Sequence, residues 1–135
     1  MDVSESMCNQ LGEKIKDLAC EVEILQMDLT KTKLETKFDA IISSMTMHHI
    51  KDIQAMFNDF YNMLNDNGTI AISDLDIEDG TFHTENTGVF HFGFDRNEFQ
   101  SKVITAGFKN VKIITASIDE KPHGKYPVFL LTGNK

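Results

Sequence analysis

The strongest pattern of apolar and polar positions starts at Ile53 and keeps helical spacing as far as Leu64. Apolar residues three or four positions apart lie on one face of a helix, and Asp52 stands where a capping side chain is expected. The pattern therefore predicts a helix with one buried face. The residues of that face are Ile53, Met56, Phe57, Phe60, Tyr61 and Leu64.

Two further helices are predicted from their caps. Ser4 can cap a helix whose apolar stripe should pack inward. That stripe consists of Met7, Leu11, Ile15 and Leu18. Asp95 and Glu98 match the capping-box pattern, and the helix after them should stop at Gly107. Residues 78–94 show no clear period and are expected to form a long loop.

Five segments have the apolar or alternating character of strands. They are Val22–Met27, Phe38–Ser44, Thr69–Ser73, Lys109–Ala116 and Tyr126–Thr132. The second should be buried, because it is too uniformly apolar to be half-exposed. Only a polar loop, 117–125, separates the last two strands, so we expect them to form an antiparallel hairpin. Residues 65–68, which precede the third strand, are turn residues that tolerate positive φ.

Alternating strands and helices predict an α/β sheet that is mainly parallel, with an antiparallel C-terminal hairpin, in a single domain over residues 1–135. Open α/β sheets bind ligands outside the carboxyl ends of their strands. The strand Phe38–Ser44 runs directly into serine, methionine and histidine residues, so residues 43–49 are where a small molecule is expected.

Composition excludes several classes of function. The formal net charge of −8 disfavours duplex nucleic acid, because phosphate binding depends on clusters of Lys and Arg. Cys8 and Cys20 are too few for a disulfide framework and lack zinc-ligand spacing. No run approaches the roughly 20 apolar residues that span a bilayer, and the polar, acidic N-terminus is unlike a signal peptide. We therefore expect a reduced, cytoplasmic protein without a membrane partner.

Several segments, in this order and spacing, resemble the class I S-adenosylmethionine-dependent methyltransferases over nearly the whole chain. They are MDVSESM, LQMDL, FDAIISSMTMHHI, FYNMLNDNGTIAISDLD, AGFKNVKI and YPVFLLTGNK. The resemblance implies a three-layer Rossmann-like sheet. The segment DLDIEDGTFH…GVFHFGFDR is similar to a bacterial branch that acts on small molecules.

The family's first strand and glycine-rich loop should precede MDVSESM, and the sequence does not contain them. Three explanations stay open: a truncated chain, which we favour, a chain that borrows the missing part from a partner, or a relic of a methyltransferase. A sheet that lacks this strand would have unpaired edges, so we expect a homodimer or a strand swap.

The resemblance implies S-adenosylmethionine as cofactor. Asp2 corresponds to the acid that accepts hydrogen bonds from the ribose hydroxyls, or it is a solvated N-terminal acid. Asp28 corresponds to the acid beside adenine, with Leu29 against the ring, or it is a turn residue. The residues expected near the sulfonium, or else forming a simple strand end and turn, are Ser43, Ser44 and Met45.

Histidines supply the candidate catalytic groups. His48 or His49 could take a proton from the acceptor, or hold the backbone at the head of the following helix. We expect the two rings to point apart and no metal to be bound. Four residues of the long loop region are expected at the substrate, or else merely bond one another. They are Asp74, Asp76, His83 and His91.

These residues predict a methyltransferase, or the larger part of one, that moves a methyl group to a small-molecule acceptor. The alternative is a non-catalytic, methyltransferase-like fragment that acts as an assembly or interaction module. An NAD-binding domain shares the sheet and the ribose acid, but the histidine pair and the terminal hairpin fit the methyltransferase pattern better.

Overall fold

The computed structural model describes residues 1–83 and 88–135. The chain forms two compact units, residues 1–34 and residues 35–135. Each unit is described by itself. Whether the two together make up a single domain stays a prediction.

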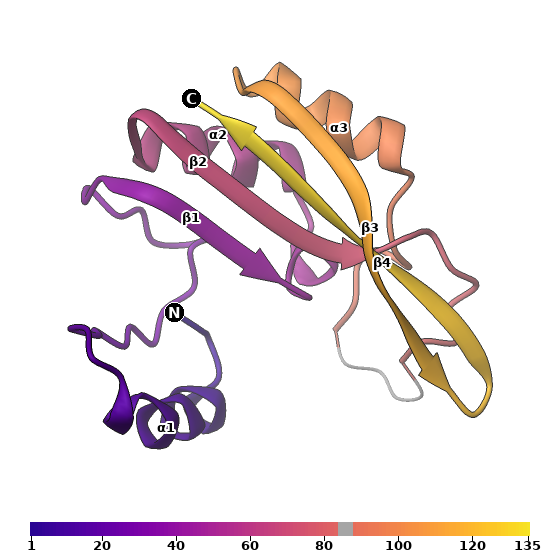
Figure 1. Ribbon diagram of the computed structural model, residues 1–135, viewed down its shortest axis with the longest axis horizontal. Helices are drawn as coiled ribbons and strands as arrows, with labels where there is room; N and C mark the ends of the chain where they lie inside the picture. The colour runs from indigo at the N-terminus through magenta and orange to yellow at the C-terminus, as the bar shows by residue number, and fades with distance from the viewer. Residues whose placement is uncertain (84–87) are drawn as a thin grey trace. The chain divides into compact units, whose positions relative to one another are not determined.

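The larger unit is built on a mixed four-stranded sheet (Figure 1). The strands are β1 (Phe38–Ser44), β2 (Leu64–Leu75), β3 (Lys109–Lys121) and β4 (Gly124–Asn134). Their order is β1-β2-β4-β3. β1 and β2 are parallel, while β4 is antiparallel to both β2 and β3. The predicted C-terminal hairpin is therefore confirmed.

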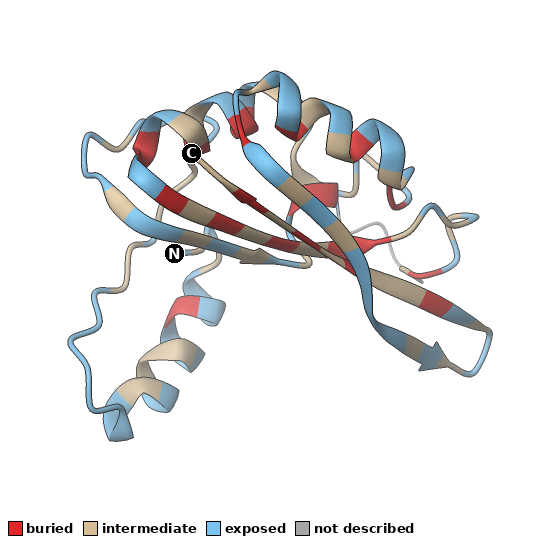
Figure 2. Ribbon diagram, turned by 45° about the horizontal axis from the view of Figure 1, so that its top comes forward, coloured by how far each residue is buried: buried red, intermediate tan, exposed pale blue. Residues whose placement is uncertain are grey.

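Two helices, α2 (Ile53–Met63) and α3 (Arg96–Thr105), lie on the same face of this sheet (Figure 2). Both predicted caps are confirmed: Asp52 accepts from the amide of Ala55, and Asp95 from two amides of the first turn of α3. Aromatic rings join the layers, because Phe99 makes edge contacts with Phe57 of α2 and Phe129 of β4. The core of the unit therefore lies between α2, α3 and the sheet.

Burial of β1 differs from expectation. Its predicted bounds are confirmed, but the strand is half-exposed, and the side chain of Ile42 is 79% exposed. The reason is that Ile42 pairs with Ala71, on the opposite face from the buried residues Ile70 and Ile72 that lie toward the helices. The edge position of β1, with β2 as its one hydrogen-bonded neighbour among the described strands, adds to the exposure. The apolar run indicated a buried strand, whereas burial depends on what lies on both sides of it.

The C-terminal strands are longer than the sequence indicates. Residues 117–121 continue β3, and β4 begins at Gly124, so little remains of the predicted polar loop 117–125. The turn at 65–68 lies within the range of β2, with Asn67 at φ +66°. Loop 78–94 is confirmed for its described residues, and residues 84–87 lie outside them.

The N-terminal unit holds α1 (Glu5–Lys14), followed by the 3₁₀ turn η1 (Ile15–Asp17). Ser4 caps α1 as predicted. The predicted inward stripe is wrong: Met7 is 51% exposed and Leu18 is 55% exposed. The buried residue of α1 is Cys8, which faces the N-terminal segment and donates its thiol hydrogen to the carbonyl of Asp2.

The predicted strand Val22–Met27 is reduced to one parallel bridge between Gln26 and Asp2. A longer strand would need a longer extended segment to pair with, and here the pairing segment is the short one before α1. In the described part of the chain, no helix combines the length and hydropathy needed to cross a bilayer.

Candidate functional site

The candidate site of the larger unit lies at the carboxyl ends of β1 and β2. The two strands run in register to the pair Ser44 and Ser73. Met45 then takes φ +53°, and the short 3₁₀ turn η2 (Met47–His49) follows. This sharp turn brings two histidines back over the end of β2.

His48 and Asp74 form the buried centre of the site. Nδ1 of His48 lies 2.7 Å from Oδ1 of Asp74, and both residues are at most 1% exposed. The carboxylate also accepts from the backbone amides of Met47, at 2.9 Å, and Leu75, at 2.8 Å. A carboxylate that accepts several hydrogens requires Nδ1 of His48 to be the donor. In the neutral ring, Nε2 is therefore free to accept.

His83 completes a chain of three groups. Its Nε2 lies 3.3 Å from Nε2 of His48, and because the latter accepts, His83 donates in the neutral pair. Burial lowers the pKa of His83 below its usual value, and the charges of His48, His49 and Lys121 act in the same direction. The ring of His83 is therefore neutral at physiological pH.

His49 lies beside the same two rings. Its ring centroid is 4.3 Å from that of His48 and 5.9 Å from that of His83. The expectation that the adjacent rings point apart is wrong, because the 3₁₀ turn rotates successive residues by less than an extended chain does. No local pattern of residues indicates this grouping directly, since His83 is 35 positions beyond His48.

The first part of the long loop is fixed by packing. Phe82 is buried with Leu75 and Tyr126, and its ring stacks edge-on against His83 at 4.9 Å. The amine of Lys121 lies 3.5 Å from the ring centroid of Phe82 and donates to its carbonyl. Residues from β2, β3 and β4 thus hold His83 in place.

Asp76 has a partner that the sequence analysis missed. Arg96 binds its carboxylate with two parallel hydrogen bonds of 2.6 and 2.8 Å and donates a third to Thr115. This bonding raises the pKa of Arg96. Asp76 thereby connects the end of β2 to the start of α3.

The predicted substrate residue Asp74 is fully buried. It can therefore act on a ligand only through His48.

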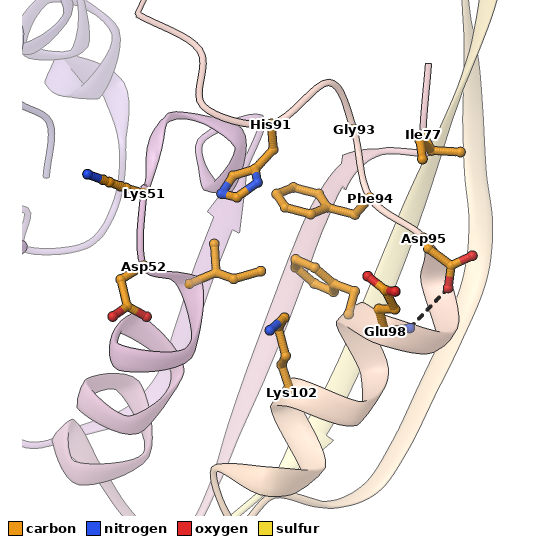
Figure 3. A pocket seen from close by; sticks show the side chains of 11 residues that line it. Lys51, Asp52, Ile77, His91, Gly93, Phe94, Asp95, Glu98 and Lys102 are labelled. Atoms are coloured by element: carbon orange, nitrogen blue, oxygen red, sulfur yellow. Dashed lines mark hydrogen bonds between the residues drawn. The ribbon is translucent and has the colours of Figure 1, made fainter. Parts of the chain in front are cut away.

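His91 lies at a different place. Its Nε2 bonds the carbonyl of Ile50 at 2.9 Å, and its ring borders a hollow of about 860 Å³ between the first turns of α2 and α3 (Figure 3). The hollow carries both signs of charge. Its main polar and aromatic lining residues are Lys51, Asp52, His91, Phe94, Glu98 and Lys102. The ring of His91 therefore lies outside the group formed by His48, His49 and His83, although its backbone amide donates to the carbonyl of His48.

The predicted sulfonium residues take ordinary strand-end positions. Ser44 accepts a hydrogen bond from the hydroxyl of Ser73, and Ser43 is half-buried. The side chain of Met45 packs against the cluster of Leu75, Phe82 and Tyr126. Their backbone lies at the predicted strand tip, and their contact with a cofactor stays a prediction.

The N-terminal unit brings the two predicted cofactor acids to neighbouring segments. Asp2 pairs in parallel with Gln26, two residues before Asp28. Asp28 is paired with Lys31 and accepts from the hydroxyl and amide of Thr30. These bonds, the threonine hydroxyl first, lower the pKa of Asp28 to about 2. Asp28 therefore has the contacts of a turn residue, and Asp2 accepts from the amide of Ser4. Contact of these two acids, and of half-buried Leu29, with a cofactor stays a prediction.

Residues 1–68, half of the chain, match the family described as "Methyltransferase domain". The chain belongs to the methyltransferase family. The chain is 32% identical over 134 residues to an uncharacterized methyltransferase of Schizosaccharomyces pombe, covering 87% of the chain and 46% of that relative. It is 35% identical over 82 residues to phosphoethanolamine N-methyltransferase 1 of Triticum aestivum, covering 60% and 16%. The chain thus spans less than half the length of these curated relatives.

Solved structures show the fold of the chain. The N-methyltransferase NodS of Bradyrhizobium japonicum, in complex with S-adenosyl-L-homocysteine, is similar to this chain with a TM-score of 0.72 at 13% identity. The likeness covers 99% of the chain and 64% of NodS. At this identity it establishes the fold, which confirms the Rossmann-like class I methyltransferase sheet. S-adenosylmethionine is the cofactor of the family.

Proposed function

We propose that the chain is the larger part of an S-adenosylmethionine-dependent methyltransferase that acts on a small-molecule acceptor. One observation carries the proposal: all eight predicted cofactor and catalytic residues, from Asp2 to His49, lie within the 68 residues that match the methyltransferase family. The net charge of −8 supports a small acceptor over nucleic acid.

Asp2 and Asp28 are proposed to hold the nucleoside part of the cofactor. Each carboxylate accepts hydrogen bonds, Asp2 from the ribose hydroxyls and Asp28 from the adenine amine, while Leu29 contacts the base. At the strand tip of β1, Ser43, Ser44 and Met45 are proposed to present backbone to the methionine part. When bound, S-adenosylmethionine supplies an electrophilic methyl group for in-line attack by a nucleophile.

His48 and His49 are the proposed proton acceptors for the nucleophile. Asp74 holds the proton of His48 on Nδ1, which leaves Nε2 as the base and stabilises the ring once it gains a proton. His48 is 1% exposed, so proton transfer passes through His83, whereas half-buried His49 is reached directly. His83, His91 and Asp76 are proposed to border the acceptor.

Calorimetric titration with S-adenosylhomocysteine tests the cofactor residues. We expect Asp2→Asn and Asp28→Asn each to weaken binding by about tenfold, because each loses a charge-assisted hydrogen bond. Glu21→Gln, an exposed acid of the same unit, should bind like the unmodified chain. Equal affinities in all three variants would refute these roles, and NodS of Bradyrhizobium japonicum, whose structure contains S-adenosyl-L-homocysteine, is the positive control.

A second candidate function is that of a non-catalytic assembly module, supported by the exposed edge of β1. Pairing two such edges would give a homodimer. Light scattering over a concentration series should show a dimeric mass that Ile42→Lys reduces, since Ile42 is 79% exposed on this strand. Ile104→Lys, on the exposed side of α3, is the matched control. A monomeric mass at every concentration would exclude this assembly.

We also propose the cytoplasm as the location, supported by two free cysteines, Cys8 and Cys20, because free thiols are typical of reducing compartments. Fractionation of cells that express the chain tests this location. Recovery of the chain with a disulfide-forming compartment would contradict it.

A further inference from the structure

Three histidines form what we call the histidine cluster: His48, His49 and His83. Each offers one ring nitrogen, and these nitrogens all lie within 4.8 Å of one another. Nε2 of His48 and Nε2 of His83 are 3.3 Å apart. A four-coordinate zinc ion with Zn–N bonds of about 2.0–2.1 Å holds its nitrogen ligands roughly 3.3 Å apart. This pair therefore already has the spacing of one edge of a tetrahedral site.

The orientation of His48 also suits a metal. Its Nδ1 donates to Asp74 at 2.7 Å, which leaves the lone pair of Nε2 directed at His83. Histidines that ligate metals usually donate their other ring N–H to a carboxylate or carbonyl, which fixes the tautomer and increases the basicity of the ligand. Asp74 is held in this role by the backbone amides of Met47 and Leu75.

The other two rings are similarly arranged. Nδ1 of His49 lies 3.4 Å from the carbonyl of Gly88, so that Nε2 is the nitrogen left for a ligand. Edge contact with buried Phe82 positions the ring of His83. His48 is buried, whereas His49 and His83 are half-buried. An ion can therefore reach the cluster from solvent and rest against His48.

We propose that the histidine cluster binds a divalent transition metal ion of the zinc class through one nitrogen of each ring. Three neutral imidazoles are a ligand set that favours Zn²⁺, Co²⁺ or Ni²⁺ over Mg²⁺ or Ca²⁺. They leave the fourth position of a tetrahedral ion open to water or to an acceptor atom, as in catalytic zinc sites. On binding, the proton on Nε2 of His83 moves to its Nδ1, so that no ring changes charge. This site does not depend on methyl transfer. While the ion is bound, Nε2 of His48 has no lone pair for a proton, so metal binding and the proposed base role exclude each other.

Cobalt is the probe for the experiment, because four-coordinate Co²⁺ has intense visible d–d bands. The tag-free 135-residue chain is treated with a chelator, dialysed and titrated with Co²⁺, and Zn²⁺ is then added to displace the cobalt. We expect one equivalent of Co²⁺ with four-coordinate bands that Zn²⁺ abolishes. Loss of an outer-shell partner alone typically costs 10- to 100-fold in metal affinity, so His49→Gln and His83→Gln should each weaken binding by about 100-fold or more.

Controls separate this site from others. His123→Gln, an exposed histidine outside the cluster, should bind cobalt like the unmodified chain, and so should Cys20→Ser, which removes the exposed thiol. Circular dichroism checks that each variant is folded, and His48 is left unchanged because it is buried. Absence of four-coordinate bands, or bands that persist in the His49→Gln/His83→Gln double variant, would overturn the proposal.

Discussion

Asp74 Oδ1 lies 2.7 Å from Nδ1 of His48, and neither residue is more than 1% exposed. This pair joins the end of β2 to the turn that follows β1. Since the same carboxylate accepts backbone amides from both segments, it fixes the position of the turn as well as the tautomer of the histidine. Structure and proposed chemistry therefore depend on one buried acid.

Replacing this acid should be costly. In Asp74→Asn an amide nitrogen replaces one carboxylate oxygen and cannot accept a hydrogen bond. Buried N–H groups that bond to this carboxylate then lose their acceptor, so we expect a loss of about 3 kcal/mol in the free energy of unfolding. Asp66→Asn, on the exposed part of β2, should change it by less than about 0.5 kcal/mol. Urea unfolding measures both, and equal losses would show that the buried carboxylate has no special role.

The Asp76–Arg96 pair gives a second prediction. Arg96→Met keeps the apolar stem but removes both hydrogen bonds to Asp76 and the one to Thr115. The side chains of Asp76 and Arg96 are 23% and 30% exposed, so partial solvent screening limits the expected loss of stability to about 1 kcal/mol. The control is Lys125→Met, which breaks the more exposed pair with Glu120. A control variant that loses as much stability would contradict this account.

Local signals in the sequence predicted the helices of the larger unit well. The apolar residues at helical spacing from Ile53 onward and the cap Asp52 predicted α2, and Asp95 predicted the start of α3. These signals act between residues at most four positions apart, so they can be read without knowledge of the rest of the fold. Gly107, with φ +110°, likewise marks the predicted helix end.

Features that depend on distant residues were missed. The exposure of Ile42 follows from its place on the face of the sheet opposite α2 and α3, in a strand at the edge of the described sheet, and no local pattern indicates either. The joining of His48 to His83, like that of Asp76 to Arg96, requires the path of the long loop. Histidines and acids were predicted as site residues by type, but the partner of each is decided by tertiary structure.

Asp28 allows a test by pH. Its pKa is lowered from 3.8 to about 2, mainly by the hydroxyl of Thr30. The folded state therefore binds this proton less readily than the unfolded chain, so the stabilising contribution is present above about pH 3.8 and is lost as the pH falls through about 2. Thr30→Val should raise this pKa toward 3.8, whereas Thr36→Val should leave it unchanged.

Carboxyl ¹³C shifts of Asp28, followed in samples that circular dichroism shows to be folded, measure this titration. At about pH 3 the unmodified carboxyl should still be mainly ionised. A midpoint near the ordinary value in the unmodified chain would mean that Thr30 does not hold the carboxylate. Ionisation at every physiological pH is what the proposed adenine acceptor requires.

Two glycines of the long loop offer a matched pair for the last prediction. Gly93 and Gly88 both have positive φ, +70° and +75°. A Cβ at Gly93 would overlap the carbonyl oxygen of Asp76, whereas one at Gly88 meets nothing within 4 Å. Gly88→Ala should therefore cost about 1 kcal/mol of backbone strain, and Gly93→Ala at least about 3 kcal/mol, because it must also open the Asp76–Phe94 bridge.

Urea unfolding gives the two losses, and hydrogen exchange locates them. In Gly93→Ala the amides of Ile77 and Phe94, which bond across the bridge, should lose protection, while in Gly88→Ala they should keep it. If both variants lose similar free energy of unfolding, and hydrogen-exchange protection is unchanged, then the loop backbone shifts at Gly93 without disturbing β2. The bridge would then contribute little to holding Asp76 against Arg96, and the packing of Phe82 would have to fix the histidine cluster alone.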